Sequence, residues 1–241
     1  RARVLLPNTL TLIGVCIGLS SINFALNQNF KLAIVAILFA AIIDGLDGRI
    51  ARLIKGTSKV GKELDSLTDV ISFGVAPAFI MYFWILNSLG KIGWLLSLMH
   101  VVCVALRLAR FNINTNSDTS WRDNFFEGVP SPAGGILVLS PLIYDVSGLD
   151  TLTLNYQFIT PIIFILTSIL LISKIPTYSL KKIIVPRSST VFLLFGIILL
   201  FGLLLIFTFK ALVIGCLIYI LAIPASIIHY NKLKKLFAND N

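Results

Sequence analysis

The chain has 241 residues, of which 57% are hydrophobic and only 13% are charged. Soluble globular domains carry about 25% charged residues, so this composition excludes an ordinary soluble protein. The net charge of +9 is a feature that nucleic-acid-binding proteins share. Membrane topology explains the basic residues better, and we expect no nucleic acid partner.

Long apolar stretches recur along the chain and predict an all-α fold, a polytopic transmembrane helical bundle. A helix needs about twenty apolar residues to cross the hydrocarbon core of a bilayer. On that basis we expect about eight spans. They lie near residues 9–27, 31–54, 61–88, 92–112, 132–147, 157–173, 190–209 and 211–230.

The basic residues are divided unequally between the two sides of this predicted topology. With the N-terminus in the cytoplasm, the outward connections carry only Lys31, Lys91 and Lys210, and the other seventeen of the twenty Lys and Arg lie inside. Cytoplasmic loops are enriched in Lys and Arg. We therefore expect an integral protein of a bacterial-type cytoplasmic (inner) membrane, surrounded by membrane lipids, with both termini facing the cytoplasm.

The second predicted span ends in a polar run, Asp44-Gly45-Leu46-Asp47-Gly48-Arg49-Ile50-Ala51-Arg52. At 100° per residue, one helix face about 140° wide holds Asp44, Asp47, Gly48, Ala51 and Arg52. Ionisable residues near an apolar bilayer are costly, so such residues are a functional-site hypothesis by default.

The third predicted span begins with a second acidic run, in which Gly61, Asp65 and Asp69 are stacked at intervals of four residues. A short basic turn joins the two helices, so four carboxylates can converge at the cytoplasmic edge. Their mutual repulsion would protonate some of them unless cations are bound, and an all-oxygen site favours Mg²⁺ or Mn²⁺. Two such ions can clamp a pyrophosphate. The alternative, that these acids only pair with neighbouring Arg and Lys, fits this spacing poorly.

The combined pattern, Asp44-x2-Asp47-Gly48-x2-Ala51-Arg52-x8-Gly61-x3-Asp65-x3-Asp69, resembles the full signature of the CDP-alcohol phosphotransferase family. The resemblance implies a core of six transmembrane helices, usually a homodimer, with a site for two metal ions open to the cytoplasm. It implies that the metal ligands are Asp44, Asp47, Asp65 and Asp69, and that Asp69 is also the catalytic general base. It assigns the CDP part of the substrate to Gly48, Ala51, Arg52, Gly61 and Asp65.

Other segments resemble the phosphatidylserine synthase branch of that family, namely residues 65–78, 105–112 and 126–134. This implies transfer of a phosphatidyl group from CDP-diacylglycerol to L-serine. The resemblance covers about residues 5–140. We expect a catalytic membrane domain over residues 1–175, and two additional C-terminal transmembrane helices over residues 176–241 that provide packing or dimer surface.

The segment Leu6-Pro7-Asn8-Thr9-Leu10-Thr11 has two compatible interpretations. It can be a helix start capped by Asn8 or Thr9. It also resembles the nucleotide-contacting segment of the family, which makes Asn8 a candidate CDP-diacylglycerol ligand.

Serine carries a carboxylate, for which Arg is a natural partner. Arg107 and Arg110, one turn apart at the end of the fourth span, are candidate serine ligands, unless both only anchor the helix at the membrane surface. His100 is expected to pack inside the bundle. Two other functions stay open. One is a sister enzyme that uses glycerol 3-phosphate or inositol phosphate, and the other is a divalent-cation transporter.

Overall fold

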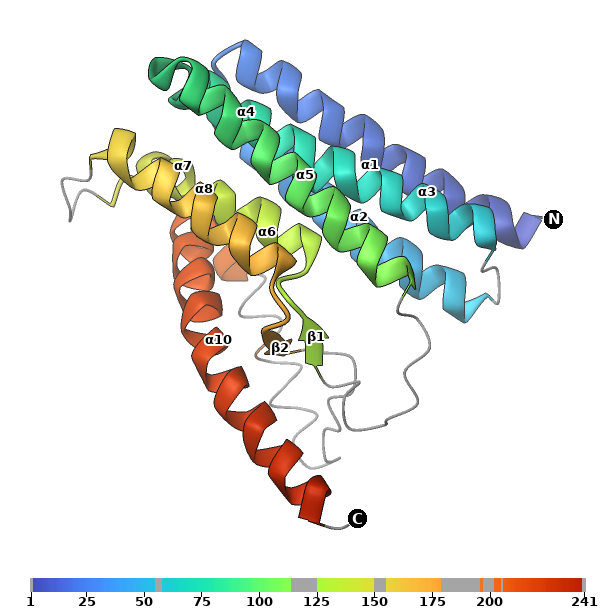
Figure 1. Ribbon diagram of the computed structural model, residues 1–241. Coiled ribbons are helices and arrows are strands. Elements are labelled where there is room, and N and C mark those ends of the chain that lie inside the picture. The colour runs from blue at the N-terminus through green and yellow to red at the C-terminus, as the bar shows by residue number, and fades with distance from the viewer. Residues whose placement is uncertain are drawn as a thin grey trace.

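A computed structural model of the chain shows a bundle of long helices joined to one short two-stranded sheet (Figure 1). It describes residues 2–54, 58–113, 125–149, 155–178, 196, 202–204 and 206–239. The all-α class is confirmed. The seventh predicted span, 190–209, lies mostly outside the described residues.

The N-terminal half forms a group of long helices that lie side by side (Figure 1). α1 (Ala2–Leu26) packs along α2 (Phe30–Leu53), and α1 also contacts α3 (Lys59–Asp69) and α4 (Ala76–Trp84). A 3₁₀ turn (Leu86–Leu89) then leads to α5 (Lys91–Ile113).

The expected helix cap at Asn8 or Thr9 is wrong, because α1 already begins at Ala2. Residues before Pro7 include good helix formers, and Pro7 removes only one backbone bond near the start of the helix. Asn8 is therefore a side chain on the body of α1.

The C-terminal half contains α6 (Ser131–Val138), α7 (Ser140–Val146), α8 (Tyr156–Ile172) and α10 (Thr208–Asn239). The predicted fifth span, 132–147, is broken into α6 and α7 at Leu139. The cause is Pro141, which has no N–H to offer the carbonyl of Leu137. α10 packs against α7 and β2.

A small sheet, which the sequence did not predict, joins the two ends of the α6–α8 segment. β1 (Phe125–Glu127) pairs antiparallel with β2 (Pro176–Tyr178), with Phe126 opposite Thr177. Gly128, at a φ of 74°, then donates its N–H to the carbonyl of Ile175 over 2.8 Å. Strands of three residues are too short to show an alternating hydrophobic pattern.

The third span contains a π-helix, Val70–Val75, between α3 and α4. Pro77 lacks the N–H that would bond the carbonyl of Phe73 in an α-helix. His100, which is completely buried on α5, fills that role with its Nε2 lying 3.2 Å from the Phe73 oxygen. The expectation that His100 packs inside the bundle is confirmed.

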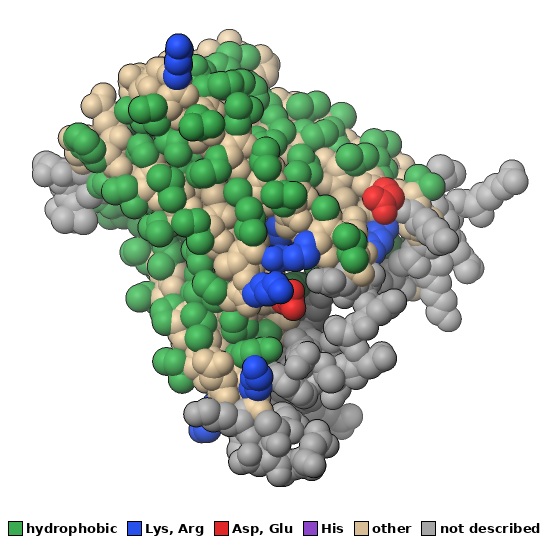
Figure 2. All heavy atoms as spheres, viewed as in Figure 1, with side chains coloured by type: hydrophobic (Ala, Val, Ile, Leu, Met, Phe, Trp, Pro, Cys, Tyr) green, Lys and Arg blue, Asp and Glu red, His purple; other side chains and the backbone are tan. Residues whose placement is uncertain are grey.

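Four described helices are long and apolar enough to cross a membrane: Pro7–Leu26, Val60–Trp84, Lys91–Ile113 and Thr208–Lys234. A shorter apolar helix covers Tyr156–Ile172. α2 is as long as these, but it carries the charged residues Lys31, Asp44, Asp47, Arg49 and Arg52. Figure 2 shows hydrophobic side chains over most of the visible face of the helices. The chain is an integral membrane protein, and its number of spans stays a prediction.

The tight packing of α5 on the preceding 3₁₀ turn gives a test of this fold. A Cβ atom at Gly93 would overlap the backbone oxygen of Leu86. We expect Gly93→Ala to lower the melting temperature in detergent by roughly 5 °C, because two backbones must move apart. Gly215→Ala on α10 is the matched control, since nothing lies within 4 Å of its added methyl. A Gly93→Ala protein as stable as the control would contradict the packing of α5.

Candidate active site

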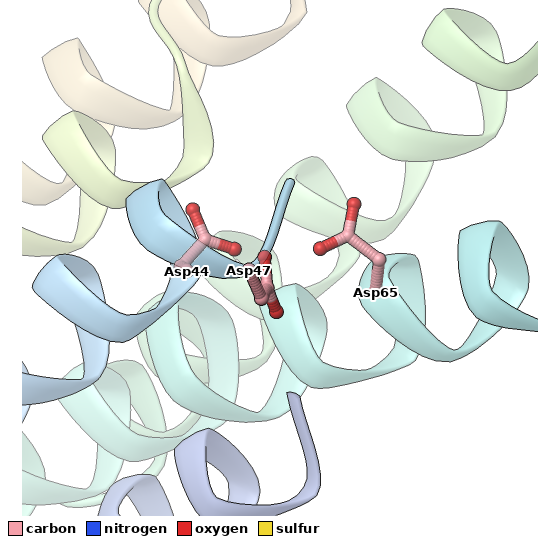
Figure 3. A group of neighbouring side chains, drawn as sticks. All are labelled: Asp44, Asp47 and Asp65. Atoms are coloured by element: carbon pink, nitrogen blue, oxygen red, sulfur yellow. The ribbon is translucent and has the colours of Figure 1, made fainter. Parts of the chain in front are cut away.

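Three aspartates from two helices turn their carboxylates toward a common space (Figure 3). Asp44 and Asp47 lie on α2 and Asp65 lies on α3, and one oxygen of each lies within 4.8 Å of the others. Oxygen ligands lie about 2.0–2.6 Å from Mg²⁺ or Ca²⁺, so opposite ligands of one ion are about 4–5 Å apart. The group therefore fits a divalent cation.

α1 packs against α2 and α3 and brings a hydroxyl close to these three aspartates. Thr11 donates a hydrogen bond of 2.6 Å to Oδ2 of Asp47, which is 4% exposed. α1 comes close to the third span at Gly18, where an added Cβ would lie 2.5 Å from Oγ of Ser72. The sequence did not predict a role for Thr11, although it is the last residue of the segment 6–11 that contains Asn8.

Asp69 is outside the group of three and lies at the end of α3, where the π-helix begins. It is 8% exposed and lies next to Asp44, Asp65 and Ser131. Its Oδ1 has no hydrogen-bond partner among the described residues. A buried carboxylate with an unused acceptor can receive a proton from a bound ligand.

The two candidate serine ligands have different surroundings. Arg107 is 7% exposed and donates from Nη1 to the hydroxyl of Ser131 over 2.7 Å. It lies close enough to Asp69 for the two charges to interact. Its Nε has no partner among the described residues.

Arg110 instead binds the end of α8. Its Nη1 and Nη2 donate to the carbonyls of Ile172 and Ser173, at 2.5 and 3.1 Å. An Arg at a helix C-terminus satisfies carbonyls that have no partner within the helix. The structure thus brings Arg107 to Asp69 and gives Arg110 a structural contact.

The candidate nucleotide ligands come from three helices. A Cβ at Gly61 would lie 2.8 Å from Oδ1 of Asn8, so α1 and the start of α3 meet at these two residues. Gly48 and Ala51 follow Asp47 along α2 and are partly buried. The side chain of Arg52 lies outside the described part of the chain. Contact with a nucleotide stays a prediction for all of them.

The fold and the site together define a polytopic helical membrane protein in which a group of three aspartates can bind a divalent cation. The profile of the CDP-alcohol phosphatidyltransferase family matches residues 4–228. The chain therefore belongs to this family, as the aspartate signature indicated. Family members generally use divalent metal ions.

Several relatives carry the name CDP-diacylglycerol–serine O-phosphatidyltransferase. The protein of Mycobacterium leprae is 40% identical over 185 residues, which are 76% of this chain and 61% of the relative. That of Helicobacter pylori strain 26695 is 39% identical over 179 residues, 74% of each chain. That of Methanocaldococcus jannaschii is 35% identical over 183 residues, 75% of this chain and 78% of the relative. The match to the mycobacterial relative thus spans less than two thirds of its length.

The hydrogen bond from Thr11 to Asp47 predicts a role in metal affinity. Groups that orient a metal ligand typically contribute 10–100-fold to metal affinity. We expect Thr11→Val to weaken Mn²⁺ binding by about 10-fold, measured by the electron paramagnetic resonance signal of free Mn²⁺. Thr11→Ser keeps the hydroxyl and should bind Mn²⁺ like the unmodified chain. Equal affinity of the Val and Ser variants would show that the hydroxyl does not orient Asp47.

Proposed function

We propose that the chain transfers the phosphatidyl group of CDP-diacylglycerol to L-serine, giving phosphatidylserine and CMP. The observation that carries this proposal is the acidic group of α2 and α3 next to the buried pair Asp69 and Arg107. The proposal is also supported by the relatives described above, which share the name CDP-diacylglycerol–serine O-phosphatidyltransferase.

In this proposal Asp44, Asp47 and Asp65 hold two divalent ions, Mg²⁺ or Mn²⁺, and Asp69 contributes from the neighbouring turn. When bound, such ions neutralise the pyrophosphate of the substrate and make its phosphorus more electrophilic. Thr11 fixes the orientation of Asp47. The CDP group is held by Asn8, Gly48, Ala51, Arg52, Gly61 and Asp65.

Asp69 is the general base. Its carboxylate takes the proton of the serine hydroxyl as the serine oxygen forms a bond to the β-phosphorus of CDP-diacylglycerol. The bond from that phosphorus to the bridging oxygen breaks, and CMP leaves with the electron pair. Asp69 is 8% exposed, so the proposed base itself is shielded from bulk water.

Arg107 binds the carboxylate of serine, and its Nε, which has no partner among the described residues, is one donor for that bond. Ser131 holds the guanidinium in place through the bond to Nη1. Arg110 was the second candidate, but its bonds to the end of α8 favour a structural role. The proposed serine site therefore depends on Arg107.

The site faces the cytoplasm in our proposal, in a bacterial-type inner membrane, because seventeen of the twenty Lys and Arg lie on that side of the predicted topology. Both substrates would then enter from the cytoplasmic side. A homodimer, usual in the family, stays a prediction.

Release of CMP by the purified protein tests the proposed function. We expect CMP release from CDP-diacylglycerol in the presence of serine and a divalent cation, and at least 10-fold less with glycerol 3-phosphate or inositol phosphate. These alcohols carry a dianionic phosphate, which needs more cationic partners than a carboxylate does. Preference for either phosphate-bearing alcohol would make the chain a sister enzyme instead.

If Asp69 is the general base, turnover should fall when its carboxylate, the proton acceptor, is replaced. An amide cannot accept the hydroxyl proton, so Asp69→Asn should lower kcat by about 10²–10⁴-fold. The matched control is Asp145→Asn, an exposed aspartate on α7, which should leave kcat unchanged. Turnover of the Asp69 variant near that of the control would exclude this role.

The orientation can be tested by cysteine labelling in a chain whose three cysteines are replaced by alanine. Ser88 follows α4 and Lys232 lies near the end of α10, and both are exposed. A membrane-impermeant maleimide added outside intact cells should label Ser88→Cys and leave Lys232→Cys unlabelled until the membrane is opened. The reverse labelling pattern would invert the proposed topology.

A further inference from the structure

Three buried polar atoms, on Arg107 and on two residues that interact with it, have no hydrogen-bond partner among the described residues. They are Oδ1 of Asp69, Nε of Arg107 and the hydroxyl of Tyr219. The three residues come from α3, α5 and α10. Buried polar groups are nearly always hydrogen-bonded, so neighbouring groups with unused capacity indicate a place for a polar ligand.

Tyr219 lies where α10 and the residues around the start of α6 share one small apolar cluster. Tyr219 packs against the buried cluster of Val129, Leu137, Cys216 and Ile223. Val129 is two residues before Ser131, the partner of Arg107. The Tyr219 hydroxyl lies near Thr177 and close enough to Arg107 for an electrostatic interaction. Arg107 in turn interacts with Asp69.

The hydrogen-bonding capacity of these atoms matches an amino acid that carries a hydroxyl group. The Arg107 Nε–H and the Tyr219 O–H are donors, and a carboxylate accepts two such bonds. The free oxygen of Asp69 accepts a proton from an alcohol. The pyrophosphate of the other substrate needs cations, and the acidic group of α2 and α3 is the place for those.

We propose that Tyr219 of α10 belongs to the acceptor site, where its hydroxyl and Nε of Arg107 together hold the carboxylate of the amino-acid alcohol. This inference rests on the proposed function and adds to it a residue of the C-terminal segment, 176–241. That segment is then part of the substrate site as well as a packing surface.

Removal of the Tyr219 hydroxyl tests the inference with little disturbance of the fold. A hydrogen bond to a charged group contributes enough that Tyr219→Phe should raise the KM for serine by about 10-fold or more. The KM for CDP-diacylglycerol should stay within about twofold. The melting temperature without serine should not fall, because this hydroxyl has no partner among the described residues.

Tyr178→Phe is the matched control, because it removes another hydroxyl from the same α10 interface. The Tyr178 hydroxyl lies 3.2 Å from Nδ1 of His229. A ligand stabilises the state that it binds in proportion to ln(1 + [L]/Kd). The rise in melting temperature on addition of serine therefore reports serine affinity without catalysis. At one serine concentration, the rise in melting temperature should be smaller for Tyr219→Phe than for Tyr178→Phe, which should match the unmodified chain.

Two results would overturn the role of Tyr219. One is an unchanged serine KM with an unchanged serine-induced rise in melting temperature. The other is a lower melting temperature and a lower kcat at an unchanged serine KM, as expected of a packing residue. Failure of the unmodified chain to release CMP with serine would instead overturn the proposed function.

Discussion

The structure depends on the cost of holding carboxylates inside an otherwise apolar helical bundle. Asp47 and Asp69 are more than nine-tenths buried, and Asp44 and Asp65 lie beside them. Burying a charge is expensive unless it is paired or hydrogen-bonded. Thr11 on α1 supplies a bond to Asp47, Arg107 on α5 supplies a positive charge near Asp69, and the group of three fits a cation. The packing of several helices is thus tied to the same few acidic side chains.

The sequence predicted those features of the site that depend on residues close together in the chain. Aspartates three or four residues apart share one face of a helix, and a short turn joins the two helices, so the four carboxylates can converge. The apolar runs likewise predicted most helices. The break at Leu139 was visible in Pro141, but an apolar run that long also fits one continuous span.

Other features could not be predicted because they depend on contacts between segments far apart in the chain. Thr11 and Asp47 are 36 residues apart, and Arg110 is 62 residues from the carbonyl of Ile172 that it binds. A hydroxyl or a guanidinium in a sequence carries no sign of its distant partner. The same holds for β1 and β2, whose pairing joins two short segments on either side of α6–α8.

The π-helix at Val70–Val75 has a consequence for the rotation of the third span. A π-turn holds one more residue than an α-turn, so it changes by about 100° the direction in which every later residue faces. The span therefore presents Asp65 and Asp69 to the acidic site on one side of the π-helix, and Ile80 and Met81 to the fully buried core on the other. Loss of one residue there would remove this offset, so that Asp65 and Asp69 could no longer face the acidic site while Ile80 and Met81 face the core.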